Sequence, residues 1–258
     1  MKTHIISVIN HKGGVGKTTS AANIGAGLHL FKRRVLMVDI DPQANLTRHF
    51  GLSKTSERSV YGALNGEYPL PRVGVKDGLD VVPSHQDMIG WEKSVADEPG
   101  RELLLREALS PVVGDYDYVL IDCPPSLNLL PVNALSASSE VLITVEPSLF
   151  SIDGMGSILS AVSKVRARIN KDLCDYRILI TRFFASKVLH RNAEEIIRQN
   201  YGGRVLKTAI RTNVALEEAV MNGVDIFQYD SASNGAKDYK SVCEEIMRSE
   251  ELRVKSEE

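Results

Sequence analysis

Cysteine is scarce in this 258-residue sequence, and the three that occur, Cys123, Cys174 and Cys243, stand far apart. A sparse, odd set forms neither a disulfide framework nor a Cys-x-x-Cys metal site, so we expect free thiols in a reducing compartment. No apolar run reaches the length of a membrane-spanning helix. Polar side chains interrupt the first ten residues too early for a signal peptide. These absences predict a soluble intracellular protein.

A strong excess of charge of one sign is also missing. Lys and Arg number 31 against 33 Asp and Glu, which gives a formal net charge of -2. This balance excludes a globally basic, histone-like nucleic-acid binder but allows a local basic patch, because net charge averages over all faces. A chain of this length buries a sizeable core without disulfides or metals. Since no repeat or low-complexity segment divides it, we predict one domain over residues 1–258.

Short, nearly continuous apolar runs recur along the chain, as is typical of strands buried on both faces of a parallel sheet. The predicted strands are His4–Ile9, Val35–Asp39, Leu79–Pro83, Tyr118–Asp122, Val141–Val145 and Arg177–Thr181. Segments with helical spacing lie between them, at Thr18–Phe31, Arg101–Val113, Ile152–Ile169 and Ala193–Tyr201. This alternation predicts an α/β fold with a doubly wound, mostly parallel sheet flanked by helices, and ligands beyond the carboxyl ends of its strands. Residues 51–91 are less regular, with a helical excursion and short strands, and the charged tail from about Ser249 predicts a frayed end.

A glycine-rich loop follows the first strand and reads His11-Lys12-Gly13-Gly14-Val15-Gly16-Lys17-Thr18-Thr19. It matches the phosphate-binding pattern Gly-x-x-x-x-Gly-Lys-[Ser/Thr], except that His11 replaces the first glycine. The glycines let backbone N–H groups approach phosphate oxygens, and the helix that begins near Lys17 adds its positive end. Lys17 reaches the β- and γ-phosphates, and the Thr18 hydroxyl ligates Mg²⁺. A P-loop NTPase site is therefore predicted, with these nucleotide-binding residues: Lys12, Gly13, Gly14, Val15, Gly16, Lys17, Thr18 and Thr19.

Carboxylates end two of the predicted strands. Asp39 and Asp41 close the second strand, and Asp122 follows four apolar residues of the fourth. A buried strand that presents a carboxylate to Mg²⁺, often through water, is the Walker B arrangement, which predicts Asp122 as a metal residue. The residues alone leave Asp39 and Asp41 as either strand-end caps or groups that face the phosphate loop. No His or Cys cluster competes for the metal, and no hydrolytic triad stands out.

Taken together, these segments resemble the ParA/MinD family of ATPases, whose deviant Walker A motif contains Lys-Gly-Gly-x-Gly-Lys-Thr-Thr. In that family the early lysine, here Lys12, crosses to the partner's nucleotide in an ATP sandwich dimer. Residues 38–45 match the family's Val-Asp-x-Asp-Pro-Gln-x-Asn motif, and residues 121–126 match Ile-Asp-Cys-Pro-Pro-Ser. The resemblance implies that Asp41 orients the attacking water and that Asp39 is structural or an outer-shell Mg²⁺ ligand. It thus implies catalytic roles for Lys12, Lys17 and Asp41, with ATP and Mg²⁺ as cofactors.

A later segment, residues 208–219, resembles the ParA sequence Thr-x-Ile-Pro-Arg-Asn-Val-Arg-Leu-x-Glu-Ala, which borders the adenine in that family. The resemblance implies that Arg211 and Asn213 bind ATP. Two positions depart from it, because Arg211 stands where proline is common and Ala215 where an arginine implicated in DNA binding is common. The match therefore does not carry that DNA contact to this chain. Residues 229–239 follow the family again, so the resemblance runs from about Thr3 to Met247.

Positive charge is concentrated in residues 161–211, which hold twelve Lys and Arg against four Asp and Glu. This stretch carries a formal charge of +8, so the remainder carries -10. Sequence-independent DNA binding requires such a concentration, whereas the alternative is a set of solvated helix faces that point in different directions. The family resemblance favours DNA binding. The candidate contacts are Lys187, Arg191, Arg198, Arg204, Lys207 and Arg211.

The interpretation that the resemblance favours is a ParA/Soj-like partition ATPase in the cytoplasm and on the nucleoid. It would form an ATP-dependent homodimer that binds DNA without sequence preference. Weak intrinsic ATP hydrolysis, stimulated by DNA and by a ParB-like partner, would then release it.

Three alternatives remain open. A MinD-like, membrane-cycling division regulator needs a basic amphipathic end, but six acidic residues face three basic ones from Ser241 on, which anionic lipid would repel. A nitrogenase-reductase-like redox protein needs cluster-ligating cysteines, which Cys123 and Cys174 supply poorly. A nucleoid-based ATPase that positions a non-DNA cargo would use the same chemistry.

Overall fold

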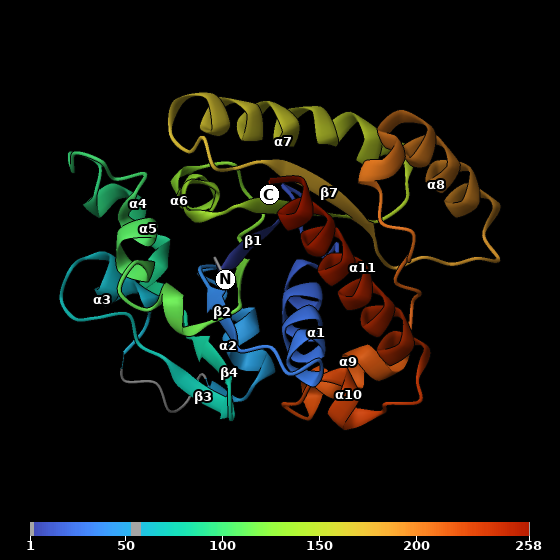
Figure 1. The fold of residues 1–258 in the computed structure, drawn as a ribbon, viewed down its shortest axis with the longest axis horizontal. Coiled ribbons are helices and arrows are strands. Elements are labelled where there is room, and N and C mark those ends of the chain that lie inside the picture. Colours follow the sequence, from blue (N-terminus) through green and yellow to red (C-terminus); the bar gives the residue numbers. More distant parts are fainter. Residues whose placement is uncertain (1–2, 53–57, 258) are drawn as a thin grey trace.

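A seven-stranded sheet forms the centre of the molecule in the computed structural model, which describes residues 3–52 and 58–257 (Figure 1). The strand order is β3-β4-β2-β5-β1-β6-β7, and every neighbouring pair is parallel except β3 and β4. The predicted doubly wound, mostly parallel α/β fold is thereby confirmed. The strand bounds are β1 His4–Ile9, β2 Val35–Asp39, β3 Val73–Lys76, β4 Leu79–Val82, β5 Tyr118–Asp122, β6 Glu140–Val145 and β7 Asp175–Ile180.

Helices cover both faces of the sheet, so alternate strand residues enter two separate cores. Ile9 and Leu36 point into the core beneath α5, α6 and α7, whereas Val8 and Val35 point into the core beneath α1 and α11. Figure 1 shows α1 and α11 side by side across the front of the sheet and α7 along its upper edge. The helix bounds are α1 Lys17–Leu30, α2 Asn45–His49, α3 Val60–Leu64, α4 Trp91–Ser94, α5 Leu104–Leu109, α6 Leu129–Ala137, α7 Leu149–Arg168, α8 Val188–Tyr201, α9 Val214–Met221, α10 Ile226–Tyr229 and α11 Asn234–Glu257. Among the described residues, no helix combines the length and apolarity needed to cross a bilayer.

Strand bounds follow the apolar runs closely because β2, β5 and β6 are buried along their whole length. β6 nevertheless begins one residue before the predicted run, at Glu140. The Glu140 carboxylate is buried, accepts a hydrogen bond from His4 Nε2 at 3.0 Å and pairs with the Arg177 guanidinium. Hydropathy does not reveal a strand that begins with a paired buried charge.

One predicted helix is much shorter than expected. The helix expected over Arg101–Val113 is helical only at Leu104–Leu109, followed by a 3₁₀ turn at Val113–Asp115. Pro111 lies between the two and supplies no backbone N–H for a continuous helix. In residues 51–91, of which 53–57 lie outside the described residues, α3 and β3 form the expected helical excursion and short strand.

Helix α11 continues to Glu257, past Ser249, where the sequence predicts the start of a frayed tail. Arg177 Nη1 donates a hydrogen bond to Ser249 Oγ at 2.7 Å, and the Tyr118 hydroxyl donates one to Glu250 Oε2. These bonds attach the helix to strands β7 and β5. Composition shows only the charge of this segment and not its partners on the sheet.

Candidate active site

The glycine-rich loop joins β1 to α1 at the carboxyl edge of the sheet. Gly14 and Gly16 have φ angles of 73° and 77°, in the left-handed region that non-glycine residues rarely adopt. Gly16 precedes α1, whose first turn has no side-chain cap and contains no acidic residue. The N-terminal end of α1 therefore keeps N–H groups and positive potential for an anion.

Lys17 lies at the bottom of this loop. Its side chain is buried, and its Nζ donates a hydrogen bond to the Lys12 carbonyl at 3.0 Å. Burial lowers the pKa of Lys17, while the nearby carboxylate of Asp122 opposes the shift. A bound phosphate would add a second anion and favour the charged ammonium further.

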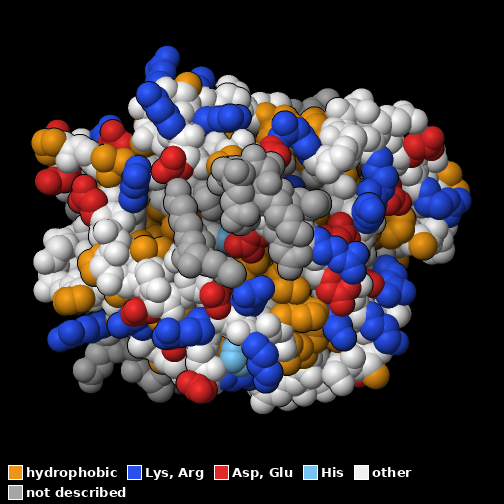
Figure 2. Space-filling view, in the orientation of Figure 1, with side chains coloured by type: hydrophobic (Ala, Val, Ile, Leu, Met, Phe, Trp, Pro, Cys, Tyr) orange, Lys and Arg blue, Asp and Glu red, His pale blue; other side chains and the backbone are white. Residues whose placement is uncertain are grey.

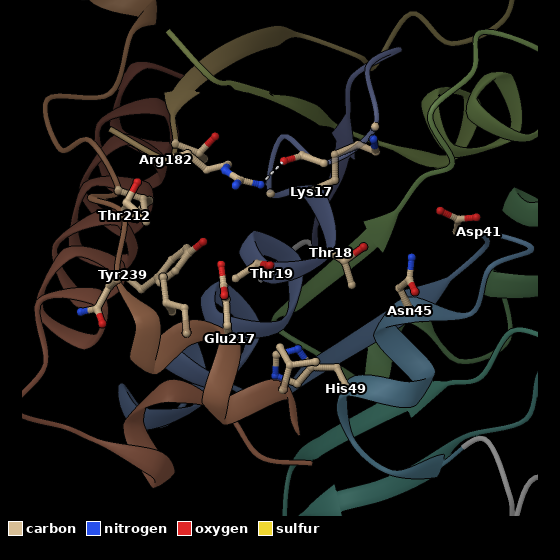
Figure 3. A pocket seen from close by; sticks show the side chains of 18 of the residues that line it. Lys17, Thr18, Thr19, Asp41, Asn45, His49, Arg182, Thr212, Glu217 and Tyr239 are labelled. Atoms are coloured by element: carbon tan, nitrogen blue, oxygen red, sulfur yellow. Dashed lines mark hydrogen bonds between the residues drawn. The ribbon is translucent and has the colours of Figure 1, made fainter. Parts of the chain in front are cut away.

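The residues at the end of β7 hold the phosphate loop in place. Thr181 Oγ1 donates a hydrogen bond to the Val15 carbonyl at 2.9 Å, and Arg182 Nη1 donates one to the Gly14 carbonyl at 3.0 Å. Arg182 itself has a φ of 52°, which aims its side chain toward the loop (Figure 3). Sequence reasoning missed both residues. The signal that could have found them is their place just beyond the carboxyl end of a predicted strand.

Three carboxylates meet where β2 and β5 end side by side, with Asp39 opposite Asp122 in the strand register. Asp39 is buried, and its two oxygens accept hydrogen bonds from the Asp41 amide at 3.1 Å and from the Thr47 amide and hydroxyl at 2.8 and 2.7 Å. Burial raises the pKa of Asp39 to about 7. These internal bonds occupy the carboxylate, which supports a structural role for Asp39. The outer-shell Mg²⁺ role that the resemblance also implies stays a prediction.

Asp122 contrasts with Asp39, because neither of its buried carboxylate oxygens has a partner of hydrogen-bonding geometry in the described part of the chain. Burial and then the charge of Asp39 raise the pKa of Asp122, while the adjacent Thr18 and Lys17 oppose that shift. An unpaired buried carboxylate beside a threonine hydroxyl fits Mg²⁺. Within residues 3–52 and 58–257 no three His, Cys, Asp or Glu side chains could hold a metal by themselves, so the remaining ligands would be phosphate and water.

Asp41 is buried at the wall of the pocket, and its Oδ1 accepts a hydrogen bond from the Gln43 amide at 2.9 Å. The loop that follows is held by Arg48, whose Nη2 donates to the Gln43 carbonyl at 2.6 Å and to Asn45 Oδ1 at 2.7 Å. Ala44 lies between them with a left-handed φ of 50°. Gln43 thus connects Arg48 to Asp41, and sequence reasoning did not identify Arg48.

A pocket of about 690 Å³ extends from the phosphate loop toward α9 and α11. Figure 3 shows Arg182, Thr212 and Tyr239 on one side, Asp41 and Asn45 on the other, and Lys17 and Thr18 between them. This volume suits a nucleoside triphosphate. All the predicted nucleotide-binding residues except Lys12 and Val15 line the pocket.

Two of these pocket residues also have structural partners. Asn213 caps α9 by accepting a hydrogen bond from the Ala215 amide at 2.9 Å. The Arg211 guanidinium forms a two-pronged pair with Asp238 of α11, with distances of 2.6 Å to Oδ1 and 3.0 Å to Oδ2. Both residues border the pocket, and the Arg211 guanidinium, which is also a predicted DNA contact, is paired with Asp238.

Lys12 projects from the opposite side of the loop. Its backbone amide donates to Asn10 Oδ1 at 2.9 Å, and its half-exposed Nζ lies 4.0 Å from Glu146 Oε2. Within one chain the Lys12 side chain therefore faces Glu146 instead of the nucleotide pocket.

Three of the six predicted DNA contacts have carboxylate partners. The guanidinium of Arg198 bonds to Glu194 and to two backbone carbonyls, Arg204 pairs with Asp175, and Arg211 is paired as described. Lys187 and Arg191 lie exposed at the start of α8, and Lys207 lies exposed beyond its end. Figure 2 shows Lys and Arg in several groups around this face of the molecule, with Asp and Glu between them.

The chain is similar to known proteins over nearly its whole length. Residues 3–174 match the family model described as "AAA domain". The chain is 38% identical to the sporulation initiation inhibitor protein Soj of Bacillus subtilis, over 94% of this chain and 97% of that protein. It is 34% identical to the chromosome partitioning protein ParA of Caulobacter vibrioides, over 96% of each. A crystal structure described as cobyrinic acid a,c-diamide synthase from Mycobacterium smegmatis, with an ATP analog and magnesium bound, superposes with a TM-score of 0.85 at 32% identity, over 95% of this chain and 94% of that one.

Proposed function

Because this chain belongs to the ParA/Soj-like family of P-loop partition ATPases, with ATP and Mg²⁺ as its cofactors, we propose that it segregates DNA through an ATP-dependent cycle on the nucleoid. The ATP-bound form is a sandwich homodimer that binds DNA without sequence preference. A ParB-like partner stimulates hydrolysis and releases it. The observation that carries the proposal is a pocket lined by the buried Lys17 and by Asp41, with the buried carboxylate of Asp122 close to Lys17 and Thr18.

The residues of this pocket divide the work of phosphoryl transfer. The phosphate loop and Lys17 bind and orient the triphosphate, and Thr18 and Asp122 hold Mg²⁺, which neutralises charge on the phosphates. Asp41 orients the attacking water from the loop that Arg48 holds. Each chain supplies these groups by itself.

Lys12 is the group that a single chain does not bring to its own nucleotide. Its ammonium lies against Glu146 and is half exposed. In the sandwich dimer it crosses to the partner's phosphates and adds positive charge there, as an arginine finger does. Hydrolysis is therefore weak in the monomer and depends on dimerisation.

Non-specific DNA binding rests on three of the predicted basic contacts for which the described part of the chain shows no ion pair. Lys187 and Arg191 stand at the start of α8 and Lys207 beyond its end, all exposed. Two copies in a dimer double the number of such contacts, which makes DNA affinity steeply dependent on dimerisation and on salt.

The test is ATP turnover measured with DNA and with a ParB-like protein, each alone and together, and DNA binding across a salt series with ATP or ADP. Synergy between DNA and partner, with binding only in ATP, is the expected result. DNA binding that is absent even at low salt with ATP would overturn the partition proposal and, with it, the positioning of another cargo on the nucleoid. A Lys187→Ala/Arg191→Ala variant should weaken DNA binding, whereas Lys164→Ala/Arg168→Ala on α7 serves as the matched control.

A further inference from the structure

We propose that the outer face of α9 and α10 is a docking surface for a basic segment of a partner protein that carries apolar anchor side chains. Met221 is 86% exposed and Val214 is 66% exposed on α9, and Tyr229 is 38% exposed on α10. The solvent face of a surface helix normally carries polar residues. Large apolar side chains in a group on such a face mark a binding site more often than single ones do.

These side chains form one continuous surface. Val214, Glu218 and Met221 stand four and three residues apart along α9, so they share one face of the helix, while Leu216 and Ala219 are buried in the core. Tyr229 joins that face from α10, because its hydroxyl donates a hydrogen bond to Glu218 Oε2 at 3.1 Å. We call these residues, with Glu217 and Asp230, the α9–α10 surface.

The charge of the α9–α10 surface is of one sign. Residues 212–236 contain four acidic residues and neither Lys nor Arg. Asp225 is buried and pairs with Lys76 at 2.5 Å, which leaves Glu217, Glu218 and Asp230 exposed. The carboxylates of this surface repel nucleic acid and anionic lipid and attract lysine and arginine. The apolar side chains among them complement leucine-like anchors of a partner. A basic, partly apolar protein segment is therefore the occupant that fits.

The position of this surface connects it to the nucleotide. Leu216, Glu217 and Val220 of the same short helix line the nucleotide pocket, and Asn213, which caps its first turn, borders that pocket too. A segment that binds the outer face of α9 thus contacts the same helix that forms one wall of the nucleotide pocket. The identification of this partner as the ParB-like activator rests on the proposed function. The chemistry of the docking surface does not depend on it.

The test compares two double variants. Glu218→Lys/Met221→Ser reverses a charge and removes the most exposed apolar side chain of the surface, and neither residue lines the pocket. Ile89→Ser/Asp97→Lys makes the same changes at exposed positions around α4. The probe is a fluorescent synthetic peptide in which lysine and arginine alternate with leucine, together with a matched peptide that has serine in place of leucine.

We expect the α9 variant to bind the leucine-containing peptide roughly tenfold more weakly than the wild type, and the control variant to bind it as the wild type does. The serine-containing peptide should bind weakly to all three. Basal ATP turnover and the melting temperature should match the wild type in both variants. Equal binding of the leucine-containing peptide by the wild type and the α9 variant would overturn the proposal. So would altered self-association in sedimentation with peptide binding unchanged, which would assign the surface to a second copy of the chain.

Full-length ParB-like protein separates this proposal from the proposed function. If it stimulates the wild type and the control but not the α9 variant, both proposals are supported. Equal stimulation of all three would refute the docking surface and leave the partition function standing. No stimulation of the wild type, with selective peptide binding intact, would refute the ParB-dependent cycle and leave the docking surface standing.

Discussion

Arg182, the second residue after β7, donates a hydrogen bond from Nη1 to the carbonyl oxygen of Gly14, 3.0 Å away in the phosphate loop. The two residues are 168 positions apart in the sequence. Arg182 also lines the pocket, so one side chain contacts the loop and the space for the nucleotide together. It therefore acts as a positioning residue that links occupation of the pocket to the shape of the loop.

Replacing Arg182 with methionine removes a charged hydrogen bond and should raise the Kd for ATP about tenfold. Arg182→Lys keeps the charge but not the reach of the guanidinium, so its Kd for ATP should lie between those of the wild type and Arg182→Met. Titration with a fluorescent ATP analogue measures the effect. Arg166→Met, an exposed substitution on α7, is the matched control. An unchanged Kd for Arg182→Met would remove this residue from the binding machinery.

Arg48 donates a hydrogen bond to the Gln43 carbonyl, and the Gln43 amide donates one to the Asp41 carboxylate. We expect Arg48→Ala to lower kcat roughly 10- to 100-fold with little change in ATP affinity, because Asp41 loses its fixed direction. Single-turnover hydrolysis separates the two quantities. In an Asp41→Ala background the Arg48→Ala change should have no further effect on turnover. Additive losses would show that Arg48 acts by another route.

Lys12→Ala should leave ATP binding by a single chain nearly intact, because its side chain faces Glu146 and not the pocket. The same change should abolish ATP-driven dimerisation and reduce stimulated turnover about 1000-fold, by analogy with the loss of an arginine finger. Sedimentation with and without ATP reports the first effect and steady-state kinetics the second. Normal dimerisation of the variant would exclude the proposed crossing of Lys12.

The buried ionic cluster of Glu140, His4 and Arg177 predicts a large effect on stability. Glu140→Gln leaves the Arg177 guanidinium without its buried counter-charge and should lower the free energy of unfolding by about 3 to 5 kcal/mol. Urea unfolding measures the loss. Glu194→Gln breaks the more exposed pair with Arg198 on α8 and should cost less than about 1 kcal/mol. Equal losses in the two variants would contradict the importance of burial.

His49 gives the fold a defined dependence on pH. Burial lowers the pKa of His49 from 6.5 to about 4, and its Nε2 lies 3.1 Å from the Val224 carbonyl. The unfolded chain therefore binds a proton between pH 6.5 and 4 that the native chain does not, so stability is lost as the pH falls through this window. The loss amounts to about 3 kcal/mol. His49→Gln should flatten the pH profile of urea unfolding there, and a profile as steep as that of the wild type would contradict this assignment.

The sequence predicts well those features of the fold and the site that depend on residues close together in the chain. β1, β2 and β5 have the predicted bounds, because burial on both faces makes each strand a nearly continuous apolar run. The phosphate loop and Asp122 were likewise found from spacing, since the chemistry of phosphate and Mg²⁺ requires those residues next to a strand.

The parts that sequence misses depend on contacts between distant residues. Arg182 and Arg48 act through backbone carbonyls, which have no sequence signature. The formal charge of the basic stretch counted Arg204 and Arg211 as available for DNA, but each pairs with a carboxylate far along the chain, Asp175 and Asp238. Composition measures how many charges there are and not which of them are already neutralised.

Helix α11 has a consequence for the order in which the protein forms. Tyr239, in its second turn, lines the nucleotide pocket, and Glu250 near its other end bonds to Tyr118 on the central strand β5. Since α11 follows every strand in the sequence, a chain emerging from the ribosome displays the complete phosphate loop long before the wall of its pocket exists. The part of the pocket wall that Tyr239 supplies is therefore synthesised after the phosphate loop and after all seven strands of the described sheet.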